Sequence, residues 1–162
     1  MIFIALGANL PSRIGPPVAT LRAALAELPS RGVAIVRVSS YYETQAWPDP
    51  SDPPFANAVA ELRTAHSPRE LLAVLHAVEE SFGRTRNVKN APRTLDLDLL
   101  DYGGRVEAGP PMLPHPRMDA RAFVLEPLRE IAPGWRHPVS GRTVTELLGN
   151  LPAAAVGLRR IR

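Results

Sequence analysis

The order of hydrophobic and polar positions predicts that the chain begins with a strand followed by a helix. The five residues between Met1 and Gly7 are all apolar, which predicts a buried strand. Beyond Pro16 the apolar residues recur every three or four positions, which is the spacing of one helix face. These residues are Val18, Leu21, Leu25 and Leu28. We therefore predict an amphipathic helix that ends at Pro29.

The next segments follow the pattern of strands. Residues 33–42, which include Val33, Ile35, Val36 and Val38, favour a strand, and residues 55–63 read as another. Both segments predict strands. Residues 43–54 lie between them and contain several prolines, so we predict a loop there.

A second helix is predicted after the strand at 55–63. Ser67 is a suitable N-cap and Glu70, three residues on, completes a capping box. The apolar stripe of this helix consists of Leu71, Leu75, Val78 and Phe82. Gly83 predicts its C-terminal end. His76 and Glu79 then lie on the opposite or flanking face, where they are available for binding.

The C-terminal half predicts one more strand and two more helices. Residues 95–102 predict a strand, residues 122–131 a third helix and residues 144–148 a short fourth helix. The resulting order β-α-β-β-α-β is that of a ferredoxin-like fold. We therefore predict an α+β protein with one antiparallel sheet packed on helices, additional C-terminal helices, and a single domain over residues 1–162.

Composition excludes several classes of protein. A chain of 162 residues can bury a core of its own, and the absence of cysteine excludes a disulfide framework, a thiolate metal site and a cysteine nucleophile. That absence agrees with a reducing compartment, and we expect a cytoplasmic protein. The N-terminus has no basic leader and too short an apolar run for a signal peptide or a membrane span, so we expect no membrane association.

The charge balance favours anionic ligands without requiring nucleic acid. There are 19 basic and 16 acidic residues, and Lys89 is the only lysine. Arginine suits forked contacts to phosphate oxygens. A ferredoxin-like RNA-binding module is the alternative that this charge and fold leave open, but no strand carries the aromatic and basic pattern of such modules. We expect a monomer that acts on small molecules and binds no nucleic acid.

The strongest candidate for chemistry is the pair Asp96 and Asp98. On a strand, alternate side chains share a face, so these two carboxylates project together while the leucines between and beside them enter the core. Their Cα atoms are then ~6.6 Å apart, which lets both reach one magnesium ion or bridge two. A solvated edge strand would show the same alternation, so the pair alone does not decide.

A basic stretch directly before the aspartates strengthens the case for phosphate binding. Residues 84–93 contain four cations, namely Arg84, Arg86, Lys89 and Arg93. Such a loop can neutralise phosphate oxygens while the aspartates hold the metal, as phosphoryl transfer requires. A solvated basic loop is the alternative. A P-loop is excluded, because the only lysine is not followed by serine or threonine.

Two further groups of residues could bind the substrates. The proline-containing segment 113–123 includes His115 and Arg121, which could contact phosphate, although a structural role is as consistent for the histidine. On the strand at 55–63, Phe55 and Asn57 share a face, so a ring and an amide could meet a flat heterocycle together. A half-buried strand would carry the same pattern.

With these residues assembled, the chain resembles the 6-hydroxymethyl-7,8-dihydropterin pyrophosphokinases, which transfer pyrophosphate from ATP to a pterin alcohol in folate synthesis. The resemblance covers nearly the whole length and rests on motifs in the family's order. They are Ala5-Leu6-Gly7-Ala8-Asn9-Leu10, Ser39-Ser40-Tyr41-Tyr42-Glu43-Thr44, Phe55-Ala56-Asn57-Ala58, Pro92-Arg93-Thr94-Leu95-Asp96-Leu97-Asp98, Leu113-Pro114-His115-Pro116-Arg117-Met118 and Phe123-Val124-Leu125-Glu126-Pro127-Leu128.

The resemblance implies roles for individual residues. It implies two magnesium ions (Mg) on Asp96 and Asp98, with Arg84 and Arg93 as catalytic arginines. It implies a pterin between the rings of Phe55 and Phe123, with Thr44 and Asn57 at its polar edge. The positions implied for the co-substrate ATP are His76, Glu79, Arg86, Lys89, Arg93, Leu99, His115 and Arg121.

The sequence also departs from the commonest family pattern. The basic loop is one residue short, and Lys89 and Asn90 stand where many members have arginine and tryptophan. Pro110 and Met112 lack the ATP-contacting side chains of some members. A magnesium-dependent nucleotide hydrolase built on the same residues is a second alternative, and it would consume ATP without any pterin.

Overall fold

The computed structural model describes residues 1–45, 51, 53–83, 94–152 and 158–161. Within them one antiparallel sheet runs in the order β5-β1-β4-β3-β6, and β2 also pairs with β4. The strands are β1 (Ile2–Ala8), β2 (Val33–Val38), β3 (Tyr41–Thr44), β4 (Phe55–Thr64), β5 (Asp96–Tyr102) and β6 (Arg159–Ile161). The long strand β4 pairs with β2 along one half and with β3 along the other.

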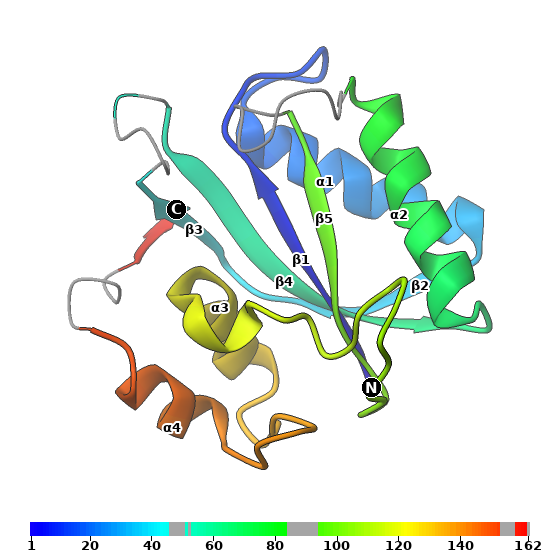
Figure 1. The fold of residues 1–162 in the computed structure, drawn as a ribbon. Coiled ribbons are helices and arrows are strands. Elements are labelled where there is room, and N and C mark those ends of the chain that lie inside the picture. Colours follow the sequence, from blue (N-terminus) through cyan, green and yellow to red (C-terminus); the bar gives the residue numbers. More distant parts are fainter. Residues whose placement is uncertain (46–50, 52, 84–93, 153–157, 162) are drawn as a thin grey trace.

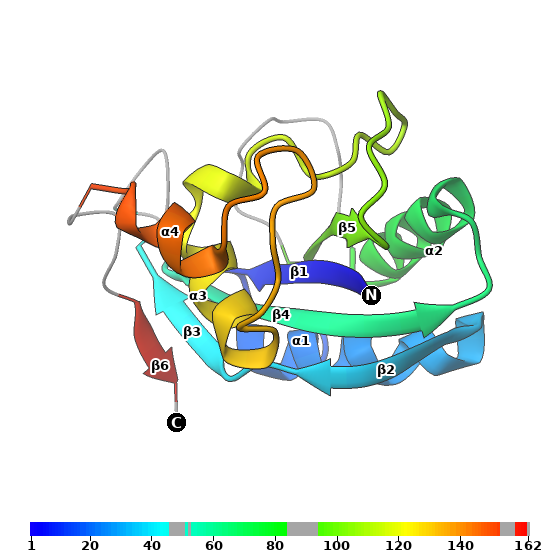
Figure 2. The ribbon, with the colours of Figure 1, turned by 90° about the horizontal axis from the view of Figure 1, so that it is seen from below.

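Helices cover both faces of this sheet (Figures 1 and 2). They are α1 (Pro17–Glu27), α2 (Pro68–Ser81), α3 (Ala122–Ile131) and α4 (Val144–Gly149), with short 3-10 segments η1 (Leu28–Arg31) and η2 (Met118–Ala120). Residues of α1 and α2 form one buried cluster with the sheet, and residues of α3 and α4 form a second cluster on the other face. The predicted ferredoxin-like α+β fold with additional C-terminal helices is confirmed.

The second helix forms for the local reasons that its sequence predicts. The Ser67 hydroxyl accepts a hydrogen bond from the backbone N–H of Glu70 at 3.2 Å, and the Glu70 carboxylate accepts one from the N–H of Ser67 at 2.9 Å. Gly83 follows the last turn with φ 85°, a left-handed conformation that favours glycine. Leu71, Leu75 and Val78 are fully buried, as the stripe predicts.

The predicted strand over residues 33–42 is wrong in one respect, because the chain forms two strands there. The hydroxyl of Ser39 accepts a hydrogen bond from the N–H of Val59 at 3.0 Å, and the N–H of Ser39 donates to the Val59 carbonyl at 2.9 Å. This side-chain bond interrupts the regular ladder at residues 39 and 40. The two halves can therefore pair with different parts of β4.

The predicted loop over residues 43–54 also begins too early. Glu43 and Thr44 belong to β3 and pair with the start of β4. On its other side β3 pairs with β6, where the Arg159 guanidinium donates to the Glu43 carboxylate at 2.6 Å. Tyr42, the middle residue of this pairing, has the Arg160 guanidinium over its ring, with the guanidinium carbon 5.7 Å from the ring centre. The sequence patterns did not predict β6.

Apolar side chains fill the face under α3 and α4 at one end of the sheet. Phe3, Val59 and Leu100 are buried there against the two helices. At the same end the Asp101 carboxylate is 4% exposed and accepts a hydrogen bond from the Trp135 indole N–H at 2.8 Å. The other end of this face carries polar side chains. Among the described residues no helix is long and apolar enough to cross a membrane.

Candidate functional site

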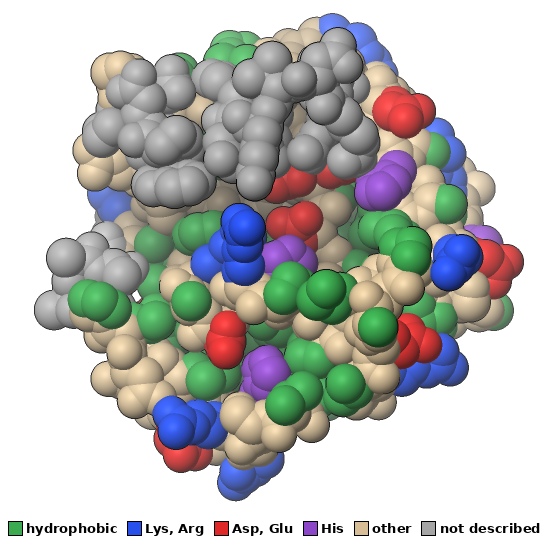
Figure 3. Space-filling model, viewed as in Figure 1, with side chains coloured by type: hydrophobic (Ala, Val, Ile, Leu, Met, Phe, Trp, Pro, Cys, Tyr) green, Lys and Arg blue, Asp and Glu red, His purple; other side chains and the backbone are tan. Residues whose placement is uncertain are grey.

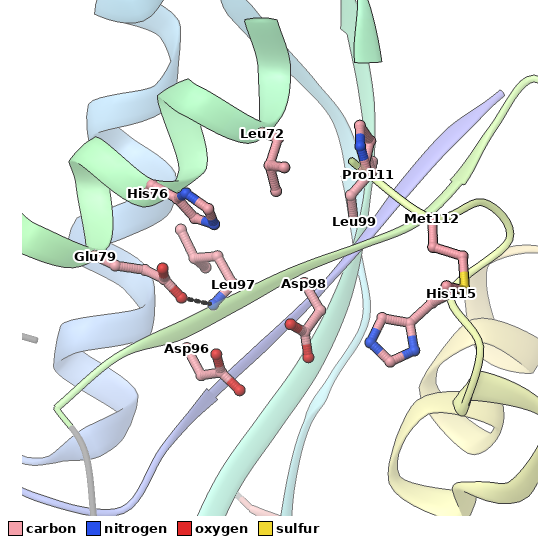
Figure 4. Close-up of a pocket in the computed structure, with 10 residues that line it drawn as sticks. All are labelled: Leu72, His76, Glu79, Asp96, Leu97, Asp98, Leu99, Pro111, Met112 and His115. Carbon is pink, nitrogen blue, oxygen red and sulfur yellow. Dashed lines mark hydrogen bonds between the residues drawn. The ribbon is translucent and has the colours of Figure 1, made fainter. Parts of the chain in front are cut away.

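Strand β5 brings Asp96 and Asp98 to the same side, as the alternation predicts. Leu95, Leu97 and Leu99 are each at most 4% exposed and enter the core with α1 and α2. The two aspartates are half-buried, and both point to the same side of β5 in Figure 4. The strand therefore separates core leucines from a pair of accessible carboxylates.

The two aspartates line an open cavity of about 160 Å³ between α2, β5 and the segment that follows β5. The lining residues are Leu72, His76, Glu79, Asp96, Leu97, Asp98, Leu99, Pro111, Met112 and His115 (Figure 4). In the space-filling view, acidic, basic and histidine side chains meet near the middle of the face (Figure 3). The predicted ATP positions His76, Glu79, Leu99 and His115 are thus brought together with the predicted metal ligands.

Helix α2 is tied to the aspartate strand by Glu79. This side chain is 1% exposed, and its Oε2 accepts a hydrogen bond from the backbone N–H of Leu97 at 2.8 Å. Because β5 is at the edge of the described sheet, its outward N–H groups have no strand partner on that side. Glu79 therefore fixes the backbone between the two aspartates. The sequence predicts the flanking position of Glu79 but not its burial.

His115 is a neutral hydrogen-bond donor at the cavity wall. Its burial, together with the nearby charge of Arg121, lowers the pKa of His115 from 6.5 to about 4, against an opposing effect of Asp96. The Nδ1 atom accepts a hydrogen bond from the backbone N–H of Arg117 at 3.1 Å. A neutral ring with Nδ1 as acceptor carries its proton on Nε2. His115 can therefore donate to a phosphate oxygen without adding charge.

Arg121 connects the aspartates to the aromatic residue at the start of α3. One guanidinium nitrogen is 3.9 Å from Oδ2 of Asp98, and the guanidinium carbon is 5.4 Å from the centre of the Phe123 ring. The side chains of Arg121 and Asp98 are 27% and 33% exposed, so this pair contacts solvent. Arg121 is therefore placed to meet both an anionic ligand and a flat one.

The residues predicted for the pterin edge also lie together. Asn57 is 5% exposed, and its Nδ2 donates to the Thr44 hydroxyl at 2.8 Å across the β3–β4 pairing. Phe55 is half-buried at the start of the same strand. Asn9, which follows β1, donates to the carbonyl of Pro53 at 3.2 Å and so holds the approach to β4. The sandwich of a pterin between Phe55 and Phe123 stays a prediction.

Four predicted site residues, Arg84, Arg86, Lys89 and Arg93, lie outside the described residues. Four cavity residues were not among the predicted site residues, namely Leu72, Leu97, Pro111 and Met112. Helical spacing could have found the first of them, because Leu72, His76 and Glu79 follow one another at i, i+4 and i+7 on α2. Pro111 and Met112 reach the cavity through the fold of a loop, for which the sequence carries no local signal.

The donor atoms of the site suit a hard cation shared with a ligand. Among the described residues there is no group of three or more histidine, cysteine or acidic side chains that could enclose a metal. Asp96 and Asp98 offer carboxylate oxygens only. Magnesium is commonly held by one or two carboxylates, with phosphate and water completing its coordination. The pair therefore fits a magnesium ion that arrives with a triphosphate.

Comparison with known proteins agrees with this geometry. Residues 3–133 match the family model described as 7,8-dihydro-6-hydroxymethylpterin-pyrophosphokinase (HPPK). Two relatives carry the name 2-amino-4-hydroxy-6-hydroxymethyldihydropteridine pyrophosphokinase. The protein from Synechocystis is 44% identical to this chain, and the match covers 94% of this chain and 77% of that protein. The protein from Pseudomonas aeruginosa is 40% identical, and the match covers 93% of this chain and 91% of that protein. The chain belongs to the HPPK family.

Solved structures support the fold. The crystal structure of wild-type Plasmodium falciparum HPPK-DHPS matches 91% of this chain and 44% of its own chain, with a TM-score of 0.64 at 14% sequence identity. A triple mutant of the same protein matches with a TM-score of 0.67 at 15% identity, over 91% and 43%. This chain spans less than half the length of those chains, and at such identity the match speaks for the fold alone.

Proposed function

We propose that the chain is a magnesium-dependent pyrophosphokinase that transfers pyrophosphate from ATP to 6-hydroxymethyl-7,8-dihydropterin, releasing AMP. Family membership supports the reaction. The observation that carries the assignment of residues is the projection of Asp96 and Asp98 into the same cavity as His76 and His115. In this proposal the cavity receives the nucleotide and the polar end of β4 receives the acceptor.

Asp96 and Asp98 would hold the magnesium ions in this proposal. When bound, the metal would neutralise charge on the phosphate oxygens and align the triphosphate. The protein's own contribution is to keep the two carboxylates in place. The 2.8 Å hydrogen bond from the Leu97 N–H to the Glu79 carboxylate supports that role, because it fixes the backbone between Asp96 and Asp98. In its more specific form, which follows the family resemblance, the proposal is that this pair of aspartates holds two magnesium ions.

The nucleotide would be oriented by donors along the cavity. His115 can offer its Nε2–H to a phosphate oxygen, and Arg121 can offer a forked guanidinium. Leu72, Pro111 and Met112 supply apolar surface at the side of the cavity away from Asp96, which suits the base of the nucleotide (Figure 4). The catalytic roles of Arg84 and Arg93, and the ATP contacts of Arg86 and Lys89, stay predictions.

The acceptor would lie against Asn57 and Thr44. A pterin edge presents both hydrogen-bond donors and acceptors, and an amide can match it with its carbonyl oxygen and N–H group. The bond to Thr44 fixes the orientation of the Asn57 amide. Half-buried Phe55 and Phe123 supply ring surfaces for a flat heterocycle. These contacts support a planar acceptor held by its edge and its faces.

In the proposed reaction the hydroxymethyl oxygen of the pterin attacks the β-phosphorus of ATP. The bond between that phosphorus and the oxygen bridging to the α-phosphorus breaks, and AMP leaves with the bridging oxygen. The hydroxyl proton passes to solvent or to a nearby carboxylate, of which Asp98 is a candidate. Such a transfer depends mainly on alignment and charge neutralisation.

Product analysis tests the proposal directly. The protein is incubated with ATP, magnesium and 6-hydroxymethyl-7,8-dihydropterin, and nucleotides and pterins are separated by chromatography. We expect AMP and the pterin diphosphate in equal amounts, and no loss of ATP when the pterin is left out. ADP as the nucleotide product would contradict pyrophosphate transfer. ATP loss without pterin would favour the nucleotide hydrolase.

A further inference from the structure

Asp96 stands at the open end of the strand that carries both aspartates. β5 begins at this residue. In the register of β1 and β5, Asp96 forms the terminal pair with Gly7, whereas Asp98 pairs with Ala5 two positions further in. β5 is also an edge strand of the described sheet, and the ends of a strand open more readily than its interior. Of the two predicted metal ligands, Asp96 therefore has the weaker support from the sheet.

Helix α2 makes one hydrogen bond to the chain on each side of Asp96. On one side the N–H of Leu97 donates to the buried carboxylate of Glu79 at 2.8 Å (Figure 4). On the other side the hydroxyl of Thr94 donates to the carbonyl oxygen of Phe82 at 2.5 Å. Both acceptors lie at the C-terminal end of α2. The start of β5 is therefore joined to this helix at two points that bracket Asp96.

Phe82, which supplies the carbonyl for Thr94, is itself held in place. Its side chain belongs to the buried cluster under α1 and α2. Its N–H donates to the carbonyl of Glu79 at 3.2 Å, and the guanidinium carbon of Arg13 lies 5.4 Å from the centre of its ring. Thr94 is only half-buried. The hydrogen bond therefore restrains Thr94, and with it the residues that lead into β5.

Capping of the helix is the alternative reason for this hydrogen bond. Carbonyl groups at the end of a helix have no partner within the helix, and the Phe82 carbonyl is one of them. If capping were the whole role of the Thr94 hydroxyl, its removal would lower stability and leave the metal site unchanged. Stability and metal binding therefore have to be measured separately.

We propose that Thr94 is a positioning residue of the metal site: its hydrogen bond to α2 holds Asp96 where this carboxylate can share a cation with Asp98. The inference rests on the proposed function and adds to it a residue that acts through Asp96. The Thr94 hydroxyl and the Glu79 carboxylate have the same task in this account, one before Asp96 and one after it.

A small displacement of Asp96 is enough to weaken a shared cation. Magnesium requires nearly octahedral geometry, with oxygen ligands at about 2.0–2.1 Å. Groups that orient metal ligands from outside the coordination sphere typically contribute about 10–100-fold to metal affinity or activity. Thr94 acts through the backbone, so we expect an effect at the lower end of this range.

The test compares Thr94→Val, which removes the hydroxyl at nearly constant size, with Thr94→Ser, which keeps it. The Kd of a nonhydrolysable ATP analogue is measured by calorimetry, first with saturating magnesium and then with a chelator and no metal. For Thr94→Val we expect the Kd with magnesium to rise about tenfold and the Kd without metal to stay within about twofold of wild type. Thr94→Ser should stay within about twofold under both conditions.

Thr64→Val is the matched control. The Thr64 hydroxyl also donates to a backbone carbonyl, that of Gly32, at 2.8 Å. This bond lies at the last residue of β4, at the other end of the strand from Asn57. The same loss of a hydroxyl there should leave the Kd of the analogue unchanged with and without magnesium.

A double variant tests whether Thr94 acts through Asp96. Once Asp96→Asn has removed the charged ligand, the position of that side chain matters little to the cation. Thr94→Val should then have no further effect, so the double variant should bind the analogue with magnesium as Asp96→Asn alone does.

Three outcomes would overturn the inference. An unchanged Kd with magnesium in Thr94→Val would leave the bond as a helix cap only. A parallel rise with and without metal would place the effect on the nucleotide cavity and not on Asp96. A further rise of about tenfold in the double variant would show that Thr94 acts independently of Asp96. If magnesium did not improve binding of the analogue to the wild-type chain, the proposed metal site itself would fail, so the two failures are distinguishable.

Discussion

The two faces of the sheet are built from the same strands, but one face is a closed apolar core and the other carries the candidate site. The face under α1 and α2 is closed by leucines, including Leu97 of β5 and Leu75 of α2, and is buried along its length. On the opposite face, apolar side chains are buried where Phe3 meets α3 and α4, and the polar side chain of Asn57 is buried outside that cluster. Its other end carries Asn57 of β4 and Asp96 of β5, of which Asp96 is drawn in Figure 4. Period-two alternation thus lets one strand supply stability on one side and chemistry on the other.

The comparison predicts that changes on the open face remove activity without unfolding the protein, and the largest effect is expected at the aspartates. Asp96→Asn keeps the size of the side chain but removes a charged metal ligand, so we expect kcat/KM to fall by about a thousandfold, or ~4 kcal/mol of transition-state stabilisation. Urea unfolding should give a stability equal to or above that of wild type, because the repulsion between Asp96 and Asp98 is relieved.

Asp119→Asn is the matched control for this variant. Asp119 is exposed on η2, and the same change there should leave kcat/KM near the wild-type value. Retention of more than a tenth of the activity by Asp96→Asn would remove Asp96 from the proposed metal site. A large loss of stability would instead mean that the open face also holds the fold together.

On the closed face the opposite result is expected. Leu75 is fully buried between α2 and the sheet, so Leu75→Ala should lower the free energy of unfolding by about 2–5 kcal/mol. The kcat of the molecules that remain folded should stay close to wild type, measured at low temperature. Val106→Ala, at a side chain that is 63% exposed, should change stability by less than about 0.5 kcal/mol. If Leu75→Ala lowered the free energy of unfolding by less than Val106→Ala does, the closed face would not be the part of the sheet that stabilises the fold.

The smallest predicted effect concerns the edge that joins β3, β6 and α3. Burial alone would raise the pKa of Glu130, but hydrogen bonds from Tyr42 and Ser40 and the charge of Arg160 outweigh it and hold the pKa below 4.5. The hydrogen bond from the Tyr42 hydroxyl is 2.5 Å long. A carboxyl with a lowered pKa in the folded state adds stability above its unfolded pKa, and that stability is lost as the pH falls through the folded value.

Glu130→Gln should therefore be less stable than wild type near neutral pH, and the difference should shrink as the pH falls from about 6 to about 3. Urea unfolding of both proteins at several pH values in this range measures the difference in the free energy of unfolding. Glu126→Gln is the matched change on the same helix, at a carboxylate bonded to the exposed Arg129 at 2.8 Å. In this variant the free energy of unfolding should fall at acid pH in the same way as in the wild type. A difference between wild type and Glu130→Gln that is independent of pH would contradict the cited pKa shift.

The sequence predicts those parts of the molecule whose causes are local. The capping box of Ser67 and Glu70, the helical end at Gly83 and the alternation of leucine and aspartate in β5 each involve residues a few positions apart, and all three are confirmed. The order of these elements along the chain was enough to predict the ferredoxin-like arrangement.

The features that the sequence did not predict depend on distant partners. The break after β2 needs the hydroxyl of Ser39 to meet the N–H of Val59, which lies 20 positions away. β6 has only three residues, and its pairing with β3 depends on how the chain returns to the sheet. The burial of Glu79 goes with its hydrogen bond to the Leu97 N–H, on a strand at the edge of the described sheet. Periodicity along the chain does not report such contacts.

The proposed function depends on Asp96 and Asp98 holding divalent cations on the triphosphate. Crystals grown with a nonhydrolysable ATP analogue and manganese in place of magnesium give anomalous difference peaks at the metal positions. We expect one or two peaks at coordination distance, about 2.1 Å, from carboxylate oxygens of both aspartates and from phosphate oxygens of the analogue. Manganese bound to the phosphates with neither aspartate as a ligand would contradict it.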